Sequence, residues 1–137
     1  MSQFVVDASV ALTWCFPDEK SDLADRVADM FRRGDSAIVP AFWPHEVLNA
    51  LLVGEKRKRI SADLIRTFIS ELAPLPIVLV PSSTTDVFTR LQSLARERKL
   101  TPYDAAYLDL AKINGIPLAT LDDDLIRACG KAGAELL

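Results

Sequence analysis

The sequence is short of the residues that build thiolate, disulfide and imidazole sites. Its 137 residues include two cysteines, Cys15 and Cys129, and one histidine, His45. Two cysteines cannot form a disulfide framework or a four-ligand zinc site, and a Ser-His-Asp triad would have to use His45. We therefore expect no structural zinc, two thiols that are buried as small apolar groups, and a protein of the reducing cytoplasm.

Long hydrophobic runs are missing too. No apolar stretch approaches the roughly 20 residues of a membrane span. The first 16 residues lack a basic start, and Asp7 interrupts their apolar run, which argues against a signal peptide. Half of the residues are apolar and 26% are charged, as is typical of a folded globular chain. The length predicts one domain over residues 1–137 and no membrane association.

The sequence also lacks an excess of positive charge, since its formal net charge is −3. This total does not indicate nucleic-acid binding. It can mislead, however, because the local distribution of charge matters more than the sum. If four carboxylates are committed to a metal site, the remaining residues carry a formal net charge of +1.

Strand and helix patterns alternate along the whole chain. Short apolar runs predict strands at residues 4–6, 37–39, 77–80 and 117–120, and a short final strand is expected at residues 134–137. Amphipathic periodicity and capping residues predict helices at about residues 9–16, 21–34, 44–52, 61–74, 84–95, 101–115 and 122–130. Strands too apolar to face water, separated by helices, predict an α/β fold in which helices flank a mainly parallel central sheet.

Four carboxylates fall at the ends of these elements. Asp7 directly follows the first strand, and Asp122 follows the fourth after one residue. Glu46 and Asp104 lie in the first turns of two helices. In a parallel α/β sheet these ends share one edge, where ligands bind. Convergence of the four acids in one cleft is therefore geometrically plausible.

Each acid also has a purely structural explanation, because acidic side chains at helix N-termini cap free N–H groups. Asp104, three residues after Thr101, approximates a capping box. As a set, however, converging carboxylates would repel one another and raise one another's pKa values, and a divalent cation removes that conflict. Oxygen-only ligands favour Mg²⁺ or Mn²⁺ and point to metal-assisted hydrolysis of phosphodiesters.

Four motifs in the chain resemble those of a known family. They are Phe4–Ser9 (FVVDAS), Pro44–Asn49 (PHEVLN), Leu100–Tyr107 (LTPYDAAY) and Leu118–Asp122 (LATLD). Together, and in this order, they resemble the motifs of PIN-domain ribonucleases. Among these, the chain length and the motif sequences look most like those of the VapC toxins of VapBC toxin–antitoxin pairs. The resemblance implies a PIN-like three-layer α/β/α fold and a Mg²⁺- or Mn²⁺-dependent endoribonuclease. It also implies a homodimer and a VapB-like antitoxin that obstructs the active site.

Carried over residue by residue, the resemblance makes Asp7, Glu46, Asp104 and Asp122 the acidic quartet that holds the metal. Ser9, Asn49 and Thr120 match the neighbouring polar positions of the motifs. Asp123 or Asp124 could support or replace Asp122, although Asp122 completes the Thr-x-Asp pattern. Our hypothesis is that Asp7 and Asp104 carry most of the metal binding. Glu46 and Asp122 then complete the site or position the attacking water.

A basic run is the densest positive segment and comprises Lys56, Arg57, Lys58 and Arg59. It could contact RNA phosphates or simply form a solvated helix end. Aromatic residues flank the first two motifs at Trp14, Phe16, Phe42 and Trp43, where core packing is the commoner role and base stacking the alternative. Two further functions stay open. One is a DNA nuclease with the same chemistry, and the other is a non-catalytic binding module whose acids only cap helices.

Overall fold

Four parallel strands form the centre of the computed structural model, which describes all 137 residues. The strands are β1 (Gln3–Val6), β2 (Ser36–Pro40), β3 (Ile77–Val80) and β4 (Leu118–Ala119), in the spatial order β3-β2-β1-β4. At the centre of the sheet, Val5 pairs with Ile38 on one side and with Leu118 on the other. Strands β1, β2 and β4 are largely buried, as expected for apolar strands of a parallel sheet, whereas Val78 and Leu79 of the edge strand β3 are exposed.

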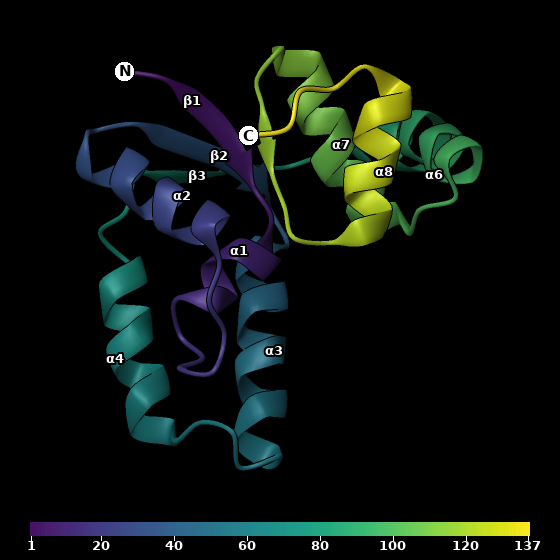
Figure 1. Ribbon diagram of the computed structural model, residues 1–137. Coiled ribbons are helices and arrows are strands. Elements are labelled where there is room, and N and C mark those ends of the chain that lie inside the picture. Colours follow the sequence, from purple (N-terminus) through teal and green to yellow (C-terminus); the bar gives the residue numbers. More distant parts are fainter.

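Eight α-helices and one π-helical turn connect and flank the strands (Figure 1). They are α1 (Ala8–Thr13), α2 (Asp22–Arg32), α3 (Trp43–Lys56), α4 (Ala62–Leu72), α5 (Thr84–Asp86), the π-helical turn η1 (Val87–Leu91), α6 (Gln92–Arg98), α7 (Pro102–Asn114) and α8 (Asp123–Ala132). None of these helices is both long enough and apolar enough to span a lipid bilayer.

The core lies between the sheet and the helices on its two sides. On one side Phe31 of α2 packs against Phe4 of β1, with 5.3 Å between the ring centroids. On the other side α7 packs on β1, β2 and β4 and contributes the fully buried Tyr107 and Leu108. In Figure 1, α2 and α7 lie on different sides of the strands, and α3 and α4 extend away from the sheet as an arm. This confirms the predicted three-layer α/β/α architecture.

The strand order determines where a ligand site can form. From β1 the chain adds β2 and β3 on one side of the sheet, and later returns to add β4 on the other side of β1. The order therefore reverses between β1 and β4. In open parallel sheets, the crevice beyond the carboxyl ends of the strands at such a reversal is the usual binding site. Asp7 follows β1 here, and Thr120 follows β4.

Three predicted elements differ from those observed. The helix predicted at 9–16 is α1 and ends at Thr13, because the chain turns before Pro17. The strand predicted at 134–137 is absent; the C-terminus makes one isolated bridge, from Leu136 to Leu118. Two backbone hydrogen bonds join that segment to Leu118 of β4. The pairing is no longer than this because β4 itself has only two residues. Glycine marks the end of α8 as expected, although the helix runs past Gly130 to Gly133.

Candidate active site

Asp7 is the most buried carboxylate of the predicted quartet, with 7% of its surface exposed. It occupies the N-cap position of α1, but its side chain makes no capping hydrogen bond. Its Oδ2 instead accepts hydrogen bonds from the hydroxyls of Ser9, at 2.8 Å, and Thr120, at 2.7 Å. Its other oxygen, Oδ1, receives no hydrogen bond from a side chain. The capping explanation therefore does not account for Asp7.

The two hydroxyls that hold Asp7 also hold the turn that follows β4. The Thr120 hydroxyl accepts a hydrogen bond from the backbone N–H of Asp122, at 3.1 Å. The Ser9 hydroxyl accepts one from the backbone N–H of Leu121, also at 3.1 Å. Each hydroxyl thus uses its donor on Asp7 and its acceptor on the turn. This arrangement fixes Asp7 relative to the segment that carries Asp122.

Glu46 and Asp104 come from the first turns of α3 and α7. Glu46 accepts a hydrogen bond on Oε1 from the hydroxyl of Tyr107, at 2.5 Å. The backbone N–H of Asp104 bonds to the capping hydroxyl of Thr101, but the Asp104 carboxylate makes no reciprocal hydrogen bond. The capping box suggested by the sequence is therefore only half formed, and the carboxylate of Asp104 is left free for another role.

Asp122 is the member of the quartet that does cap its helix. Its Oδ1 accepts a hydrogen bond from the backbone N–H of Leu125 in the first turn of α8, at 3.0 Å. Capping and ligand binding are compatible, because a carboxylate has two oxygens. Of the four acids, one is explained by capping and the other three are not.

The pKa values of Asp7, Glu46 and Asp104 are raised, in part by the charges of other members of the quartet. Burial raises the pKa of Asp104 to about 6, and the charges of Asp122 and Asp7 add to the increase, as Glu46 does to a smaller extent. Burial also raises the pKa of Asp7, against the opposing hydrogen bonds from Thr120 and Ser9, and the charge of Asp122 raises it further. No Lys or Arg forms a salt bridge with any member of the quartet. The site is therefore an uncompensated negative cluster.

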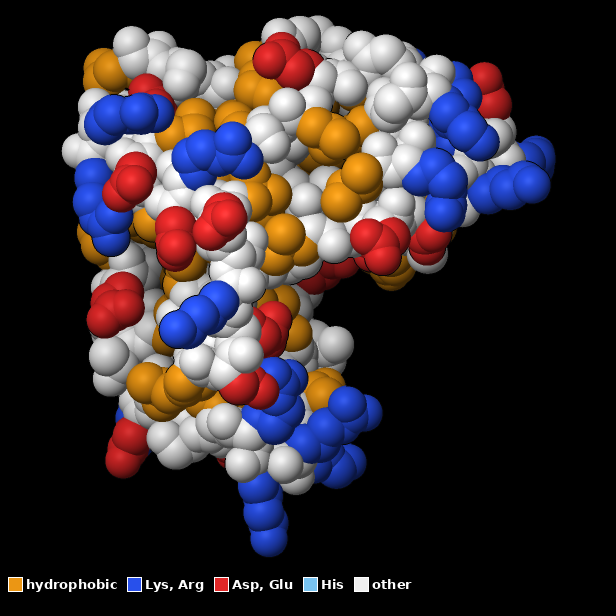
Figure 2. Space-filling model, viewed as in Figure 1, with side chains coloured by type: hydrophobic (Ala, Val, Ile, Leu, Met, Phe, Trp, Pro, Cys, Tyr) orange, Lys and Arg blue, Asp and Glu red, His pale blue; other side chains and the backbone are white.

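The pKa of Glu46 is raised in the same way. Burial is the main cause, the hydrogen bond from Tyr107 acts in the opposite direction, and the charge of Asp7 adds to the rise. Of the two alternative acids, Asp124 is among the charges that raise the pKa of Asp104. Figure 2 shows acidic side chains along the concave corner between the part that contains α7 and α8 and the arm of α3 and α4.

The donor set suits a hard divalent cation in its chemistry. It is made entirely of carboxylate and hydroxyl oxygens, and a cation would relieve the mutual repulsion. As the side chains stand, no group of three or more His, Cys, Asp or Glu residues is arranged so that it could hold a metal ion. Binding a cation would therefore draw the carboxylates closer together than they lie here.

Asn49 lies on α3 three residues after Glu46, and the basic run lies at the C-terminal end of the same helix. Asn49 is exposed on α3 and lines a cavity of about 430 Å³ together with Ser9, Leu121 and Arg57. Arg59 also reaches this cavity, but it pairs with Asp18 and Glu19, each at 3.2 Å. Its guanidinium lies 4.4 Å from the centre of the Phe16 ring.

The other three basic side chains of the run, Lys56, Arg57 and Lys58, are exposed and form no salt bridge. Basic side chains gather at the end of α3 away from the sheet in Figure 2. The cavity thus connects the neighbourhood of Asp7, through Ser9 and Leu121, with Arg57, which has no acidic partner within the protein.

Tyr107 is the residue of the site that sequence reasoning missed. It was recognised as part of the third motif but given no role. Its spacing from Asp104 was the available signal, because residues three apart lie on the same face of a helix. What the sequence could not show is that this face meets Glu46 of α3.

The flanking aromatic residues take the core-packing role. Phe16 and Trp43 are buried, and Trp14 and Phe42 are partly buried. The indole N–H of Trp14 donates to the backbone carbonyl of Ala24, at 2.9 Å. His45 is exposed, and Cys15 and Cys129 are buried free thiols, as expected.

Comparison with known proteins agrees with this fold. The sequence profile of the PIN domain matches residues 4–131, so the chain belongs to the PIN-domain family. Over 123 residues it is 31% identical to Ribonuclease VapC3 of Pyrobaculum aerophilum, covering 90% of this chain and 92% of that protein. The resemblance to PIN-domain proteins of the VapC type, read from the four motifs, is thereby confirmed.

Two solved structures share the fold. PAE2754 from Pyrobaculum aerophilum superposes with a TM-score of 0.69 at 23% identity, covering 93% of this chain and 87% of its own. FitAcB from Neisseria gonorrhoeae gives a TM-score of 0.61 at 15% identity, covering 100% and 96%. At these identities the likeness establishes the three-dimensional arrangement and nothing further.

Proposed function

We propose that this protein is a Mg²⁺- or Mn²⁺-dependent endoribonuclease and the toxin of a type II toxin–antitoxin pair, acting in the cytoplasm. The observation that carries the proposal is the uncompensated cluster of Asp7, Glu46, Asp104 and Asp122, of which only Asp122 caps a helix. Its place in a PIN domain similar to a protein named as a ribonuclease favours RNA as the substrate.

Each residue has a definite task in this proposal. Asp7 and Asp104 are the principal metal ligands, and Glu46 and Asp122 complete the site or position the attacking water. Ser9 and Thr120 fix the orientation of Asp7 through their hydrogen bonds to Oδ2. When bound, Mg²⁺ or Mn²⁺ supplies Lewis-acid activation of a water nucleophile and offsets charge on the phosphate. No side chain is then needed as a general base.

The cavity beside Ser9 offers a path for the RNA backbone. It leads from Ser9 and Leu121 past Asn49 to Arg57. We propose that Lys56, Arg57 and Lys58 attract phosphates along this path, because none of them is paired with an acid of the protein. Arg59 belongs to the predicted run, but its contacts with Asp18, Glu19 and Phe16 favour a structural role.

The test is cleavage of total cellular RNA by the purified protein with Mg²⁺ or Mn²⁺, with mapping of the new 5′ ends. We expect discrete cuts from the wild type, loss of the cuts with EDTA, and a decrease of at least about 100-fold with Asp7→Asn. Asp63→Asn is a matched control, because Asp63 is an exposed acid of α4 that pairs with Arg66 and belongs to none of the four motifs. It should retain the wild-type rate.

Other outcomes of this experiment contradict the proposal. Equal cleavage by the wild type and a folded Asp7→Asn protein would remove the quartet from the mechanism. Cleavage of single-stranded DNA in preference to RNA would make the protein a DNA nuclease. Absence of both cleavage and carboxylate-dependent Mn²⁺ binding would leave a non-catalytic binding module.

We propose two protein partners, a second copy of the chain and a VapB-like antitoxin. The antitoxin follows from the similarity to a VapC protein. The test is co-purification with the protein encoded by an adjacent small gene. The complex should no longer cleave RNA. A partner that binds without affecting cleavage would contradict this assignment.

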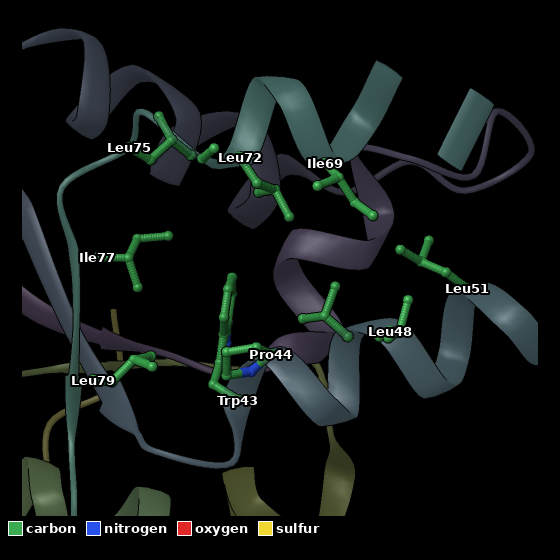
Figure 3. Close-up of a pocket in the computed structure, with 11 residues that line it drawn as sticks. Trp43, Pro44, Leu48, Leu51, Ile69, Leu72, Leu75, Ile77 and Leu79 are labelled. Carbon is green, nitrogen blue, oxygen red and sulfur yellow. The ribbon is translucent and has the colours of Figure 1, made fainter. Parts of the chain in front are cut away.

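The homodimer is supported by an apolar groove of about 400 Å³ between α3, α4 and β3. Figure 3 shows side chains of the three elements facing one hollow, among them Leu48, Ile69 and Leu79. These three are exposed although apolar, and β3 is an edge strand with no partner on its outer side. An open apolar groove beside a free strand edge is typical of a surface that another protein covers.

A further inference from the structure

Tyr107 joins the two helices that carry Glu46 and Asp104. It lies in the second turn of α7, and its side chain is completely buried. Its hydroxyl donates to Oε1 of Glu46, 61 positions away in the sequence, at 2.5 Å. A phenol hydroxyl buried beside a carboxylate is oriented by that partner, because no water competes for it.

The ring of Tyr107 is fixed by a second contact between the same helices. Phe42, which immediately precedes α3, packs edge-on against Tyr107, with 5.7 Å between ring centroids and 88° between ring planes. Phe42 makes a similar contact with Tyr103, at 5.2 Å and 86°. The starts of α3 and α7 are thus joined by a ring contact and by a hydrogen bond.

In this hydrogen bond the donor and the acceptor cannot exchange roles. The Tyr107 hydroxyl supplies the proton of this bond, because an ionised carboxylate can only accept. It can then act on Glu46 only as a donor, and it leaves the second oxygen of Glu46, Oε2, without a side-chain hydrogen bond. Asp104, three residues before Tyr107, lies on the same side of α7.

We propose that Tyr107 is a positioning residue, which holds Glu46 at a fixed distance from Asp104 and directs Oε2 towards the cation and water of the reaction. This inference rests on the proposed function and deepens it. Residues that orient a metal ligand typically change metal affinity or activity by about 10- to 100-fold when they are removed.

The test is Tyr107→Phe, which removes one oxygen and keeps the ring contact with Phe42. We expect the Mn²⁺ affinity, measured by calorimetry on the whole protein, to fall about tenfold. With RNA, kcat should fall while KM stays the same, because Tyr107 does not lie at the surface that RNA reaches. Tyr103→Phe is the matched control. Tyr103 packs on the same Phe42 ring, but its exposed hydroxyl makes no hydrogen bond, so both quantities should be unchanged.

A double mutant distinguishes positioning from general destabilisation. In a Glu46→Gln background the amide can still accept from Tyr107 but no longer provides a carboxylate. Tyr107→Phe should therefore have no further effect on Mn²⁺ affinity there. A Tyr107→Phe protein with a lower urea midpoint but wild-type Mn²⁺ affinity and kcat would overturn the inference. A wild-type protein that neither binds Mn²⁺ nor cleaves RNA would instead overturn the proposed function.

Discussion

Asp7 is a buried carboxylate whose partners are hydroxyls rather than cations. Two hydrogen bonds from Ser9 and Thr120 offset part of the cost of burying its charge, yet burial still raises its pKa. A residue placed only for stability would gain more from an Arg or Lys partner, as Asp109 does from Arg90. At the scale of single residues, the site is therefore less stable than it could be, and a bound cation would correct this.

Stability should depend on pH in a way that reveals this conflict. Without a divalent cation, the protein should become more stable as the pH falls from about 8 to about 5. The pKa values of Asp7, Glu46 and Asp104 are raised mainly by burial, that of Asp104 to about 6. A carboxyl with a raised pKa binds its proton more readily in the folded than in the unfolded state, so protonation favours folding.

We expect a gain on the order of 1 kcal/mol over this range, after allowing for solvent screening of partly exposed groups. Urea denaturation in EDTA at several pH values measures it, and saturating Mn²⁺ should reverse the trend because ionised carboxylates bind the cation. Below about pH 4 the trend should turn, since the pKa of Asp35 is lowered by its hydrogen bond with the Ser2 backbone and that stabilisation is lost on protonation. A midpoint that falls steadily from pH 8 to 5 would contradict the expectation.

At the scale of elements, the turn after β4 depends on the Thr120 hydroxyl. This hydroxyl donates to Asp7 and accepts from the Asp122 N–H, and the residue is 2% exposed. Thr120→Val keeps the shape but leaves the partly buried N–H of Asp122 without this acceptor, and Oδ2 of Asp7 with one side-chain donor instead of two. We expect a loss of about 1–3 kcal/mol in unfolding free energy, with a lower rate of RNA cleavage.

Thr120→Ser serves as the control for this variant, because it restores the hydroxyl without the methyl group. It should recover most of the stability and most of the cleavage rate. Denaturation curves and initial rates for the three proteins measure the effect. If valine and serine behave alike, the hydroxyl does not fix the turn.

The loop after α3 contains two arginines with different roles. Arg57 is exposed and unpaired at the cavity, whereas Arg59 is engaged with Asp18, Glu19 and Phe16. Arg57→Gln should weaken RNA binding. The slope of log K against log salt concentration should become shallower by about one, which corresponds to one lost phosphate contact. Arg59→Gln should mainly lower thermal stability. Binding to a single-stranded RNA at several salt concentrations tests both, and an unchanged slope for Arg57→Gln would contradict the phosphate path.

At the scale of the whole molecule, the open groove between α3, α4 and β3 predicts self-association. Leu79→Lys places a charge at the edge strand, on a side chain that is 45% exposed. We expect the wild type to be a dimer at micromolar concentration and Leu79→Lys to dissociate at least tenfold more easily, since a buried unpaired charge opposes association. Ile113→Lys is the control, on an exposed part of α7 outside the groove.

Light scattering coupled to gel filtration measures the mass of each variant. Retention of the dimer by Leu79→Lys would place the interface elsewhere on the protein. A monomeric wild type at high concentration would contradict the dimer itself.

The sequence predicted the fold well where the signals are local. Ser21, Ser61, Thr101 and Asp122 cap the helices that they were expected to start. The apolar runs at 4–6, 37–39 and 77–80 became strands, because apolar residues of a parallel sheet are removed from water by the flanking helices. The prediction failed at 134–137, where the local sequence does not show whether a strand edge is available to pair with.

For the candidate site, the sequence by itself determined the chemical type of each residue and its place at the end of a strand or the start of a helix. Local pattern is sufficient for this, since capping and periodicity act over a few residues. The tertiary structure alone decided the contacts between distant segments, such as Tyr107 with Glu46 and Arg59 with Asp18. It also decided which acids cap helices and which are left free, because only packing brings separate elements close enough for their side chains to compete for partners.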